Sequence, residues 1–333
     1  MPREIQTVET PHPAIHIVYD FVTPQEEQHL VQKIDAVGGG PALAVADRAV
    51  DEAGDGAAGG GEGTASPDGS GAAGAGAAGA SAVDRSAKSW GWKELNGRRS
   101  MYWGGTVLPN SHSLIPAPFP PFMDGQWPDV LNRIAETGVF DELKAEGADR
   151  KGEGKERGAN HCLVNEYLPS QGILPHTDGP AYQPLTATLS LSSHTILSLR
   201  SPPSWLSSPR PSTTSASQKA SDAKEVEKVD VFLPPRSLVL LSGTLYQEWL
   251  HGIQPLEVSL PESLRGCANW EQYWASRMDA CEGEEARDEV RKERVAVEDK
   301  GWKREKRISL TCRRVKGKVR KGLALGLLGG LKR

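Results

Sequence analysis

Short runs of alternating hydrophobic and polar residues dominate the second half of the chain. Such runs, bounded by turn-forming residues, predict β-strands, and many short strands with turns between them are typical of a sandwich or barrel. The predicted strands between residues 161 and 315 are HCLVNEYL, TATLSLSS, HTILSLR, VDVFLP, RSLVLLSG, YQEWLHGI and RISLTCRRV. We therefore expect a mainly β fold with flanking helices, of the α+β kind.

Helices are predicted at two places outside these strands. Residues 14–36 indicate a short strand and then an amphipathic helix, with Thr23 as its N-cap and Pro24 in its first turn. A second helix is predicted near 127–145. Before it, aromatic and basic residues are interleaved in SWGWKELNGRRSMYWGG, where order is expected to resume at Trp90.

Segments of different composition interrupt this pattern. Residues 38–87 contain 30 Gly or Ala among 50 positions, and with almost no large apolar side chain to offset the entropy of ordering we expect a disordered insertion. We also predict a Ser/Pro-rich loop at 201–227, a charged and partly helical insertion at 257–303, and a basic tail at 321–333. The rest suits a single domain within 1–333, with its core at about 88–320. Whether the 257–303 insertion is a lid over a site stays open.

Charge and cysteine content exclude some classes of function. The net charge of −4 argues against binding polyanions through bulk electrostatics, although twelve Lys or Arg and a single acid occur from Lys303 onward. The four cysteines form no C-x-x-C pair, which argues against a disulfide framework or a structural zinc site. No apolar run approaches the roughly 20 residues of a membrane span. We expect a monomer in the nucleus or cytoplasm, with no membrane association.

One group of residues has the composition of a metal site. His176 and Asp178 lie two apart in NEYLPSQGILPHTDGP, and on an extended segment both side chains can face the same ion. A His-x-acid triplet occurs about once by chance in such a chain, and a solvated surface turn is the alternative. His251, at the end of a predicted strand, adds a third ligand. Two histidines and one carboxylate form the facial triad of non-haem iron oxygenases, which leaves positions open for a co-substrate and dioxygen.

Four further residues could bind a 2-oxo acid beside that metal. Arg307 and Arg313 share one face of a predicted strand, but six residues span roughly 20 Å, so they cannot bind the same carboxylate. We assign Arg307 to the distal carboxylate and Arg313 to the iron end. Asn165 and Tyr167 alternate onto one face and can donate hydrogen bonds to the keto acid. Solvated or DNA-facing arginines and a core tyrosine are the alternatives.

Taken in order, these motifs resemble the AlkB family of dioxygenases. The segments NEYLPSQGILPHTDGPAYQP, TLSLSSHTIL, WLHGI and RISLTCRRV are similar to the AlkB homolog 6 group of that family, with its fungal and plant members. The resemblance implies a double-stranded β-helix (jelly-roll, cupin-like) core, with Fe(II), 2-oxoglutarate and O2 as cofactor and co-substrates. It implies iron ligands His176, Asp178 and His251, and keto-acid ligands Asn165, Tyr167, Arg307 and Arg313. In the implied reaction the keto acid becomes succinate while a C–H bond is hydroxylated, and a hydroxymethyl group on nitrogen is lost as formaldehyde.

The substrate is less well defined than the reaction. Aromatic and basic residues before the strands would suit a nucleotide-recognition lid, and we name Trp103, Tyr182 and Arg99 as substrate-contact candidates. A core aromatic cluster is the alternative. Several base-repairing members of the family carry an acid where this chain has Pro180, so recognition must differ. The leading hypothesis is oxidative demethylation of an alkylated base in DNA or RNA. A protein-directed hydroxylase or demethylase, and a non-catalytic nucleic-acid-binding member, are the alternatives.

Overall fold

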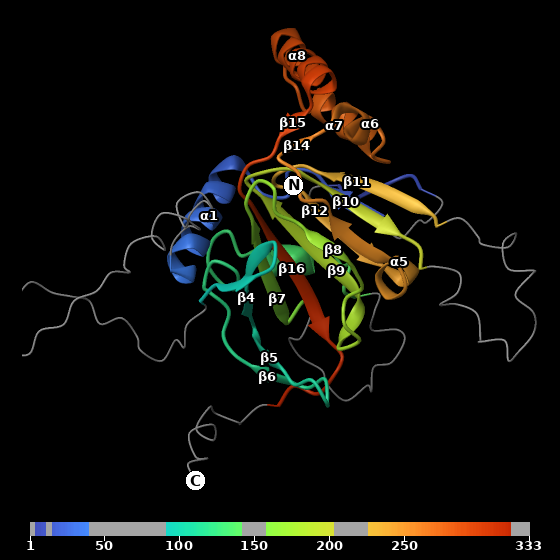
Figure 1. Ribbon diagram of the computed structural model, residues 1–333. Coiled ribbons are helices and arrows are strands. Elements are labelled where there is room, and N and C mark those ends of the chain that lie inside the picture. Colours follow the sequence, from blue (N-terminus) through green and yellow to red (C-terminus); the bar gives the residue numbers. More distant parts are fainter. Residues whose placement is uncertain (1–3, 11–14, 40–90, 142–157, 203–225, 321–333) are drawn as a thin grey trace, which may run out of the picture.

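Two antiparallel β-sheets face each other in the computed structural model, which describes residues 4–10, 15–39, 91–141, 158–202 and 226–320 (Figure 1). In spatial order, the main sheet consists of β1 (Gln6–Thr7), β2 (Ile15–Val18), β12 (Leu238–Ser242), β9 (Tyr182–Leu191), β16 (Arg307–Val315), β7 (His161–Tyr167), β4 (Arg98–Trp103) and β3 (Lys93–Leu95). The minor sheet consists of β11 (Lys228–Leu233), β10 (Thr195–Arg200), β13 (Leu250–Ile253) and β8 (Ile173–His176). From β7 to β16 the strands of the two sheets are interleaved along the chain, as in a jelly-roll, and the predicted fold class is confirmed.

The main sheet separates a helix-covered core from the space between the sheets. Because successive side chains point to opposite faces, Ile308 and Leu310 of β16 pack in the core under α1 (Pro24–Gly38) and α3 (Val130–Glu136), whereas Arg307 and Ser309 line a cavity between the sheets. Apolar residues of β2, β12, β10 and β11 fill the rest of that space. The cavity-lining residues therefore form a polar part of a layer that is otherwise mainly apolar in the described residues.

The predicted N-terminal helix begins where its capping signal lies. The Thr23 side chain accepts a hydrogen bond from the backbone of Glu26, and the Glu26 carboxylate accepts one from the backbone of Thr23, which completes a capping box. Glu26 also pairs with Arg133 at 2.9 Å and so links α1 to α3. The second helix is shorter than predicted, because α3 ends at Glu136 and a turn follows.

One segment without an assignment from the sequence forms a hairpin, and one predicted strand differs from the structure. The interleaved segment after Trp90 contains a hairpin of β3 and β4, joined at Asn96 and Gly97, and Gly97 has the positive φ that such tight turns require. The predicted strand YQEWLHGI is a strand only in β13. Its first residues belong to α5 (Gly243–Gln247), since the positive φ of Gly243 turns the chain out of β12.

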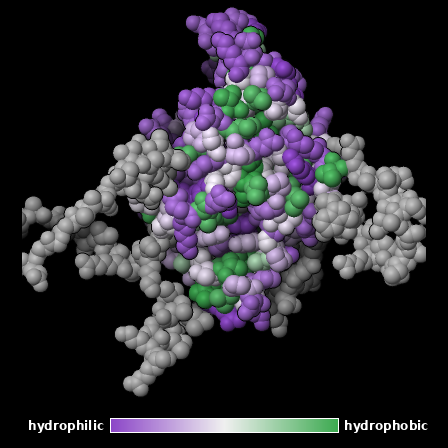
Figure 2. All heavy atoms as spheres, in the orientation of Figure 1, coloured by the Kyte–Doolittle hydropathy of each residue, from purple (hydrophilic) through white to green (hydrophobic). Residues whose placement is uncertain are grey.

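The 257–303 insertion is a compact helical unit. It comprises β14 (Val258–Ser259), α6 (Pro261–Arg265), α7 (Trp270–Asp279), α8 (Glu284–Lys300) and β15 (Trp302–Lys303). Trp270, Tyr273 and Trp274 pack on Ile196 and Phe232, on the outer face of the minor sheet. The insertion thus covers the back of that sheet, and its position does not support a lid over the cavity. At the top of the view α8 presents mainly hydrophilic side chains (Figure 2).

Several predicted segments lie outside the described residues. These are nearly all of the Gly/Ala-rich insertion, most of the Ser/Pro-rich loop, the basic tail and Trp90. Within the part of the chain that is described, no helix combines the length and the apolar character needed to cross a membrane.

Candidate active site

Strand pairing brings the three predicted metal ligands together. His176 is the last residue of β8 and Asp178 follows two residues later, while His251 lies in β13. His251 and His176 are direct partners in the antiparallel pairing of these strands, and their ring centroids are 4.3 Å apart. One potential ligand atom from each residue lies within 4.8 Å of those of the other two. This donor set can hold one metal ion.

Neighbouring groups prepare each ligand for a metal. The Nδ1–H of His176 donates to the Leu174 carbonyl at 2.9 Å, which leaves Nε2 free for an ion. Arg313 Nη1 donates to Asp178 Oδ1 at 2.9 Å and orients the carboxylate. Burial lowers the pKa of His251 to about 4, although Asp178 opposes the shift, so its ring is in the neutral, metal-binding form at neutral pH.

Arg307 has the features of a site for an organic anion. Its guanidinium is buried and donates from Nη2 to Ser190 Oγ at 2.8 Å, but Nε and Nη1 have no partner among the described residues. Burial lowers the pKa of Arg307 to about 10. A buried cation with unused donors is costly unless an anion completes it. A bidentate carboxylate fits this arrangement, and the residues present therefore suit a 2-oxo acid.

A single small cavity joins these groups. It has a volume of about 100 Å³ and is lined by the three metal ligands together with Asn165, Tyr167 and Arg307. Burial raises the pKa of Tyr167, so its hydroxyl stays protonated and can donate. Arg313 contacts Asp178, whereas Arg307 lies toward Ser190. The two arginines thus occupy different ends of the site, as the spacing along the strand predicts.

Two of the three substrate-contact candidates were assigned wrongly. Trp103 is fully buried and meets Phe122 edge-on, and Arg99 is buried and donates to both carboxylate oxygens of Glu166, at 2.7 and 2.9 Å. Both belong to the β4 face that packs under the helices, because alternate residues of a strand point to opposite sides. Tyr182 does lie at the metal end, beneath the Arg313 guanidinium at 4.1 Å, but it is buried.

Arg98 and Tyr246 are among the cavity-lining residues that the sequence did not single out as site residues. Arg98, the neighbour of Arg99, faces the cavity and donates from Nε to Asn165 Oδ1 at 3.2 Å. Tyr246 of α5 also lines the cavity, and its buried hydroxyl has no partner among the described residues. The alternation of β4 could have identified Arg98 once the strand was assigned, whereas no signal marks Tyr246.

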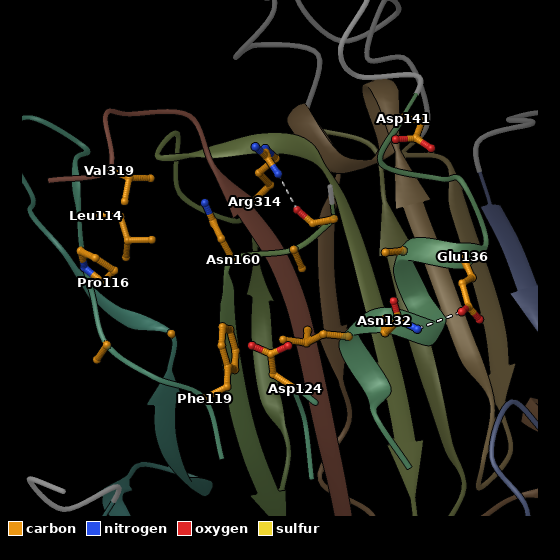
Figure 3. Close-up of a pocket in the computed structure, with 16 residues that line it drawn as sticks. Leu114, Pro116, Phe119, Asp124, Asn132, Glu136, Asp141, Asn160, Arg314 and Val319 are labelled. Atoms are coloured by element: carbon orange, nitrogen blue, oxygen red, sulfur yellow. Dashed lines mark hydrogen bonds between the residues drawn. The ribbon is translucent and has the colours of Figure 1, made fainter. Parts of the chain in front are cut away.

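A larger cavity, of about 620 Å³, lies on the opposite face of the main sheet (Figure 3). Arg314, which alternates with Arg313, donates to the Gly158 carbonyl at its edge, and Asn132 donates to Glu136 across from it. None of the predicted site residues lines this cavity. It is therefore separate from the metal site.

The jelly-roll places two histidines and a carboxylate around one point, and a buried arginine without an anionic partner among the described residues in the same cavity. This combination defines a non-haem iron oxygenase that uses a 2-oxo acid. The model of the 2OG-Fe(II) oxygenase superfamily matches residues 106–313, and the chain belongs to this superfamily. Its cofactor and co-substrates are accordingly Fe(II), 2-oxoglutarate and O2. Together these supply an oxidant for C–H bonds when bound.

Known relatives place the chain near the AlkB proteins. It is 32% identical over 167 residues to "Probable RNA/DNA demethylase ALKBH6" of Danio rerio, covering 49% of this chain and 57% of that protein. It is 38% identical over 97 residues to "Alkylated DNA repair protein ALKBH8 homolog" of Arabidopsis thaliana, covering 28% and 26% respectively. The solved structure of OsALKBH1 matches with a TM-score of 0.41 and 14% identity, over 92% of this chain and 100% of that one. The chain spans less than two thirds of the length of these curated relatives.

Proposed function

We propose that this oxygenase removes alkyl groups from bases of DNA or RNA by oxidation. The observation that carries the proposal is that the metal triad and the unpaired Arg307 share one cavity in a chain similar to a protein named as a probable RNA/DNA demethylase. His176, Asp178 and His251 would hold the iron. Arg307 would bind the distal carboxylate of 2-oxoglutarate, with Asn165 and Tyr167 as further donors.

The metal end of the cavity has aromatic groups suited to a planar substrate. Tyr102 on β4 is 47% exposed and lies against His161, with ring centroids 5.4 Å apart. His161 in turn lies against Tyr182 at 5.6 Å, and Tyr182 lies beneath Arg313, which binds Asp178. Stacking on exposed aromatic rings is a sequence-tolerant way to hold an extruded base. Tyr102, the exposed ring of this row, supports a nucleobase as substrate.

The test is the release of formaldehyde and succinate with Fe(II), 2-oxoglutarate and O2. The substrates are single-stranded DNA and RNA with N-methylated bases, the same strands without methyl groups, and methyl-lysine peptides. We expect release only from the methylated strands, and a loss of at least about 100-fold in His176→Ala. His29→Ala is the matched control, since His29 lies on α1 against Trp127 and outside the cavity.

Stimulation by the peptides alone would contradict the nucleic-acid substrate, and equal rates for wild type and His176→Ala would contradict the reaction itself. We also propose that the protein acts as a monomer in the nucleus or cytoplasm. Light scattering and cell fractionation would check these two points.

A further inference from the structure

We propose that Arg98 is a positioning residue that sets the orientation of the Asn165 amide, so that Asn165 donates hydrogen bonds to 2-oxoglutarate. The proposal rests on the predicted role of Asn165 in binding the keto acid, and it is independent of the nature of the oxidised substrate. Arg98 is the first residue of β4, and β4 pairs with β7, which contains Asn165. The Nε–H of Arg98 donates to Asn165 Oδ1 at 3.2 Å, and both residues line the cavity of the metal ligands.

The donor and acceptor groups of the two side chains determine how this hydrogen bond orients the Asn165 amide. A guanidinium carries five N–H donors and no acceptor, so the amide atom that faces Arg98 must be the oxygen. The Nδ2 group of Asn165, with its two N–H donors, is then left for a ligand in the cavity. If the amide rotated by half a turn, its oxygen would face the oxygens of the keto acid and repel them. Arg98 therefore decides whether Asn165 attracts or repels the co-substrate.

The surroundings of Arg98 hold it in this place. It follows the tight turn at Gly97, whose carbonyl accepts a hydrogen bond from the backbone N–H of Gly172 at 3.2 Å, in the loop before β8. A Cβ atom at Gly97 would lie 2.8 Å from the Gly172 carbonyl oxygen, so the turn is closely fitted to that loop. The start of β4 is thus tied to the segment that leads to His176.

The neighbouring arginine shows that the arrangement is specific to Arg98. Arg99 forms a buried bidentate pair with Glu166 on the opposite face of β4. Among the described residues no carboxylate forms an ion pair with Arg98, and its one side-chain partner is the Asn165 amide. Arg98 differs from Arg99 in facing the cavity, where the Asn165 amide accepts its hydrogen bond. The placement of Arg98 is better explained by its effect on Asn165.

The test measures 2-oxoglutarate affinity directly. The holoenzyme with Fe(II) is titrated with 2-oxoglutarate without oxygen, and the dissociation constant is read from the absorbance of the metal complex. Arg98→Lys keeps the charge but moves the donor, and we expect it to raise Kd by about 5- to 10-fold, the effect of losing one hydrogen bond. In an Asn165→Ala background the same change should alter Kd by less than about twofold. The affinity for Fe(II) should not change.

Arg99→Lys is the matched control, and it should lower the melting temperature while Kd stays within about twofold of wild type. An equal effect of Arg98→Lys with and without Asn165 would overturn the proposal, because Arg98 would then contact the ligand itself. An unchanged Kd in the single variant would overturn it as well. The titration uses no nucleic acid, so tight keto-acid binding without demethylation would contradict the proposed function alone.

Discussion

Arg307 is a buried cation whose Nε and Nη1 donors have no partner among the described residues. Such a group destabilises the protein until an anion binds, and a well-packed apolar side chain in its place removes that cost. We expect Arg307→Met to raise the unfolding free energy of the ligand-free protein by about 1–3 kcal/mol. The variant should at the same time lose the increase in melting temperature that 2-oxoglutarate with Mn(II) produces in the wild type. Thermal unfolding with and without the keto acid measures both effects.

The opposite pattern, a less stable variant that still responds to the keto acid, would show that another group neutralises Arg307. Ser190, the one hydrogen-bond partner of the Arg307 side chain among the described residues, offers a control. Ser190→Ala removes only the contact at 2.8 Å and should leave the keto-acid response in place.

His194 makes the stability of the protein sensitive to acid. Burial lowers its pKa to about 3, and the charge of Arg304 acts in the same direction. An unfolded chain binds a proton below pH of about 6.5, whereas the folded chain does not until about pH 3. Stability attributable to this residue is therefore complete above pH 6.5 and falls as the pH drops, by about 1.4 kcal/mol per pH unit.

His194→Gln, which can keep the hydrogen bond to Ser259, removes this proton from the balance. Urea unfolding at pH 7, 6 and 5 measures this effect. The unfolding free energy of the variant should fall less steeply with decreasing pH, by the slope of about 1.4 kcal/mol per pH unit that one proton contributes. Parallel slopes for the two proteins would mean that His194 is protonated in the folded state.

At the scale of single elements, α1 depends on its capping box. Thr23→Ala removes the side-chain acceptor at the first turn, and we expect it to lower the unfolding free energy by about 1 kcal/mol. The Kd for 2-oxoglutarate should not change, because α1 lies on the far side of the main sheet from the cavity. Chemical denaturation measures the first effect, and Gln25→Ala, an exposed change in the same turn, serves as the control. A similar loss in both variants would argue against the cap.

At the scale of the whole molecule, the 257–303 insertion and the jelly-roll share a core. Trp274 is fully buried, in one cluster with Trp270 and Tyr273 of α7 and with Phe232 of the minor sheet. Trp274→Ala should cost about 3–5 kcal/mol of unfolding free energy, while the metal and keto-acid affinities of the folded protein stay near wild type. Val295→Ala on α8, where the side chain is 67% exposed, should change stability by less than about 0.5 kcal/mol.

Unfolding of the insertion in a separate step, with no effect on the β core, would show that the two parts are independent. That outcome would be seen as two transitions in denaturation of the wild type. A single transition, shifted by Trp274→Ala and not by Val295→Ala, is the expected result.

The residue order alone was enough for most of the strands, for the first helix and for choosing His176, Asp178 and Arg307 as candidate ligands, because these depend on local periodicity, a capping signal and side-chain type. It could not show which side of β4 faces the cavity, so Arg99 was named where Arg98 lines the site. It could not show that α7 and α8 pack behind the minor sheet. These features depend on strand register and on contacts between residues far apart in the chain. A shift of one residue in β4 would exchange Arg98 for Arg99, and folding in three dimensions selects between them by burying Arg99 against Glu166.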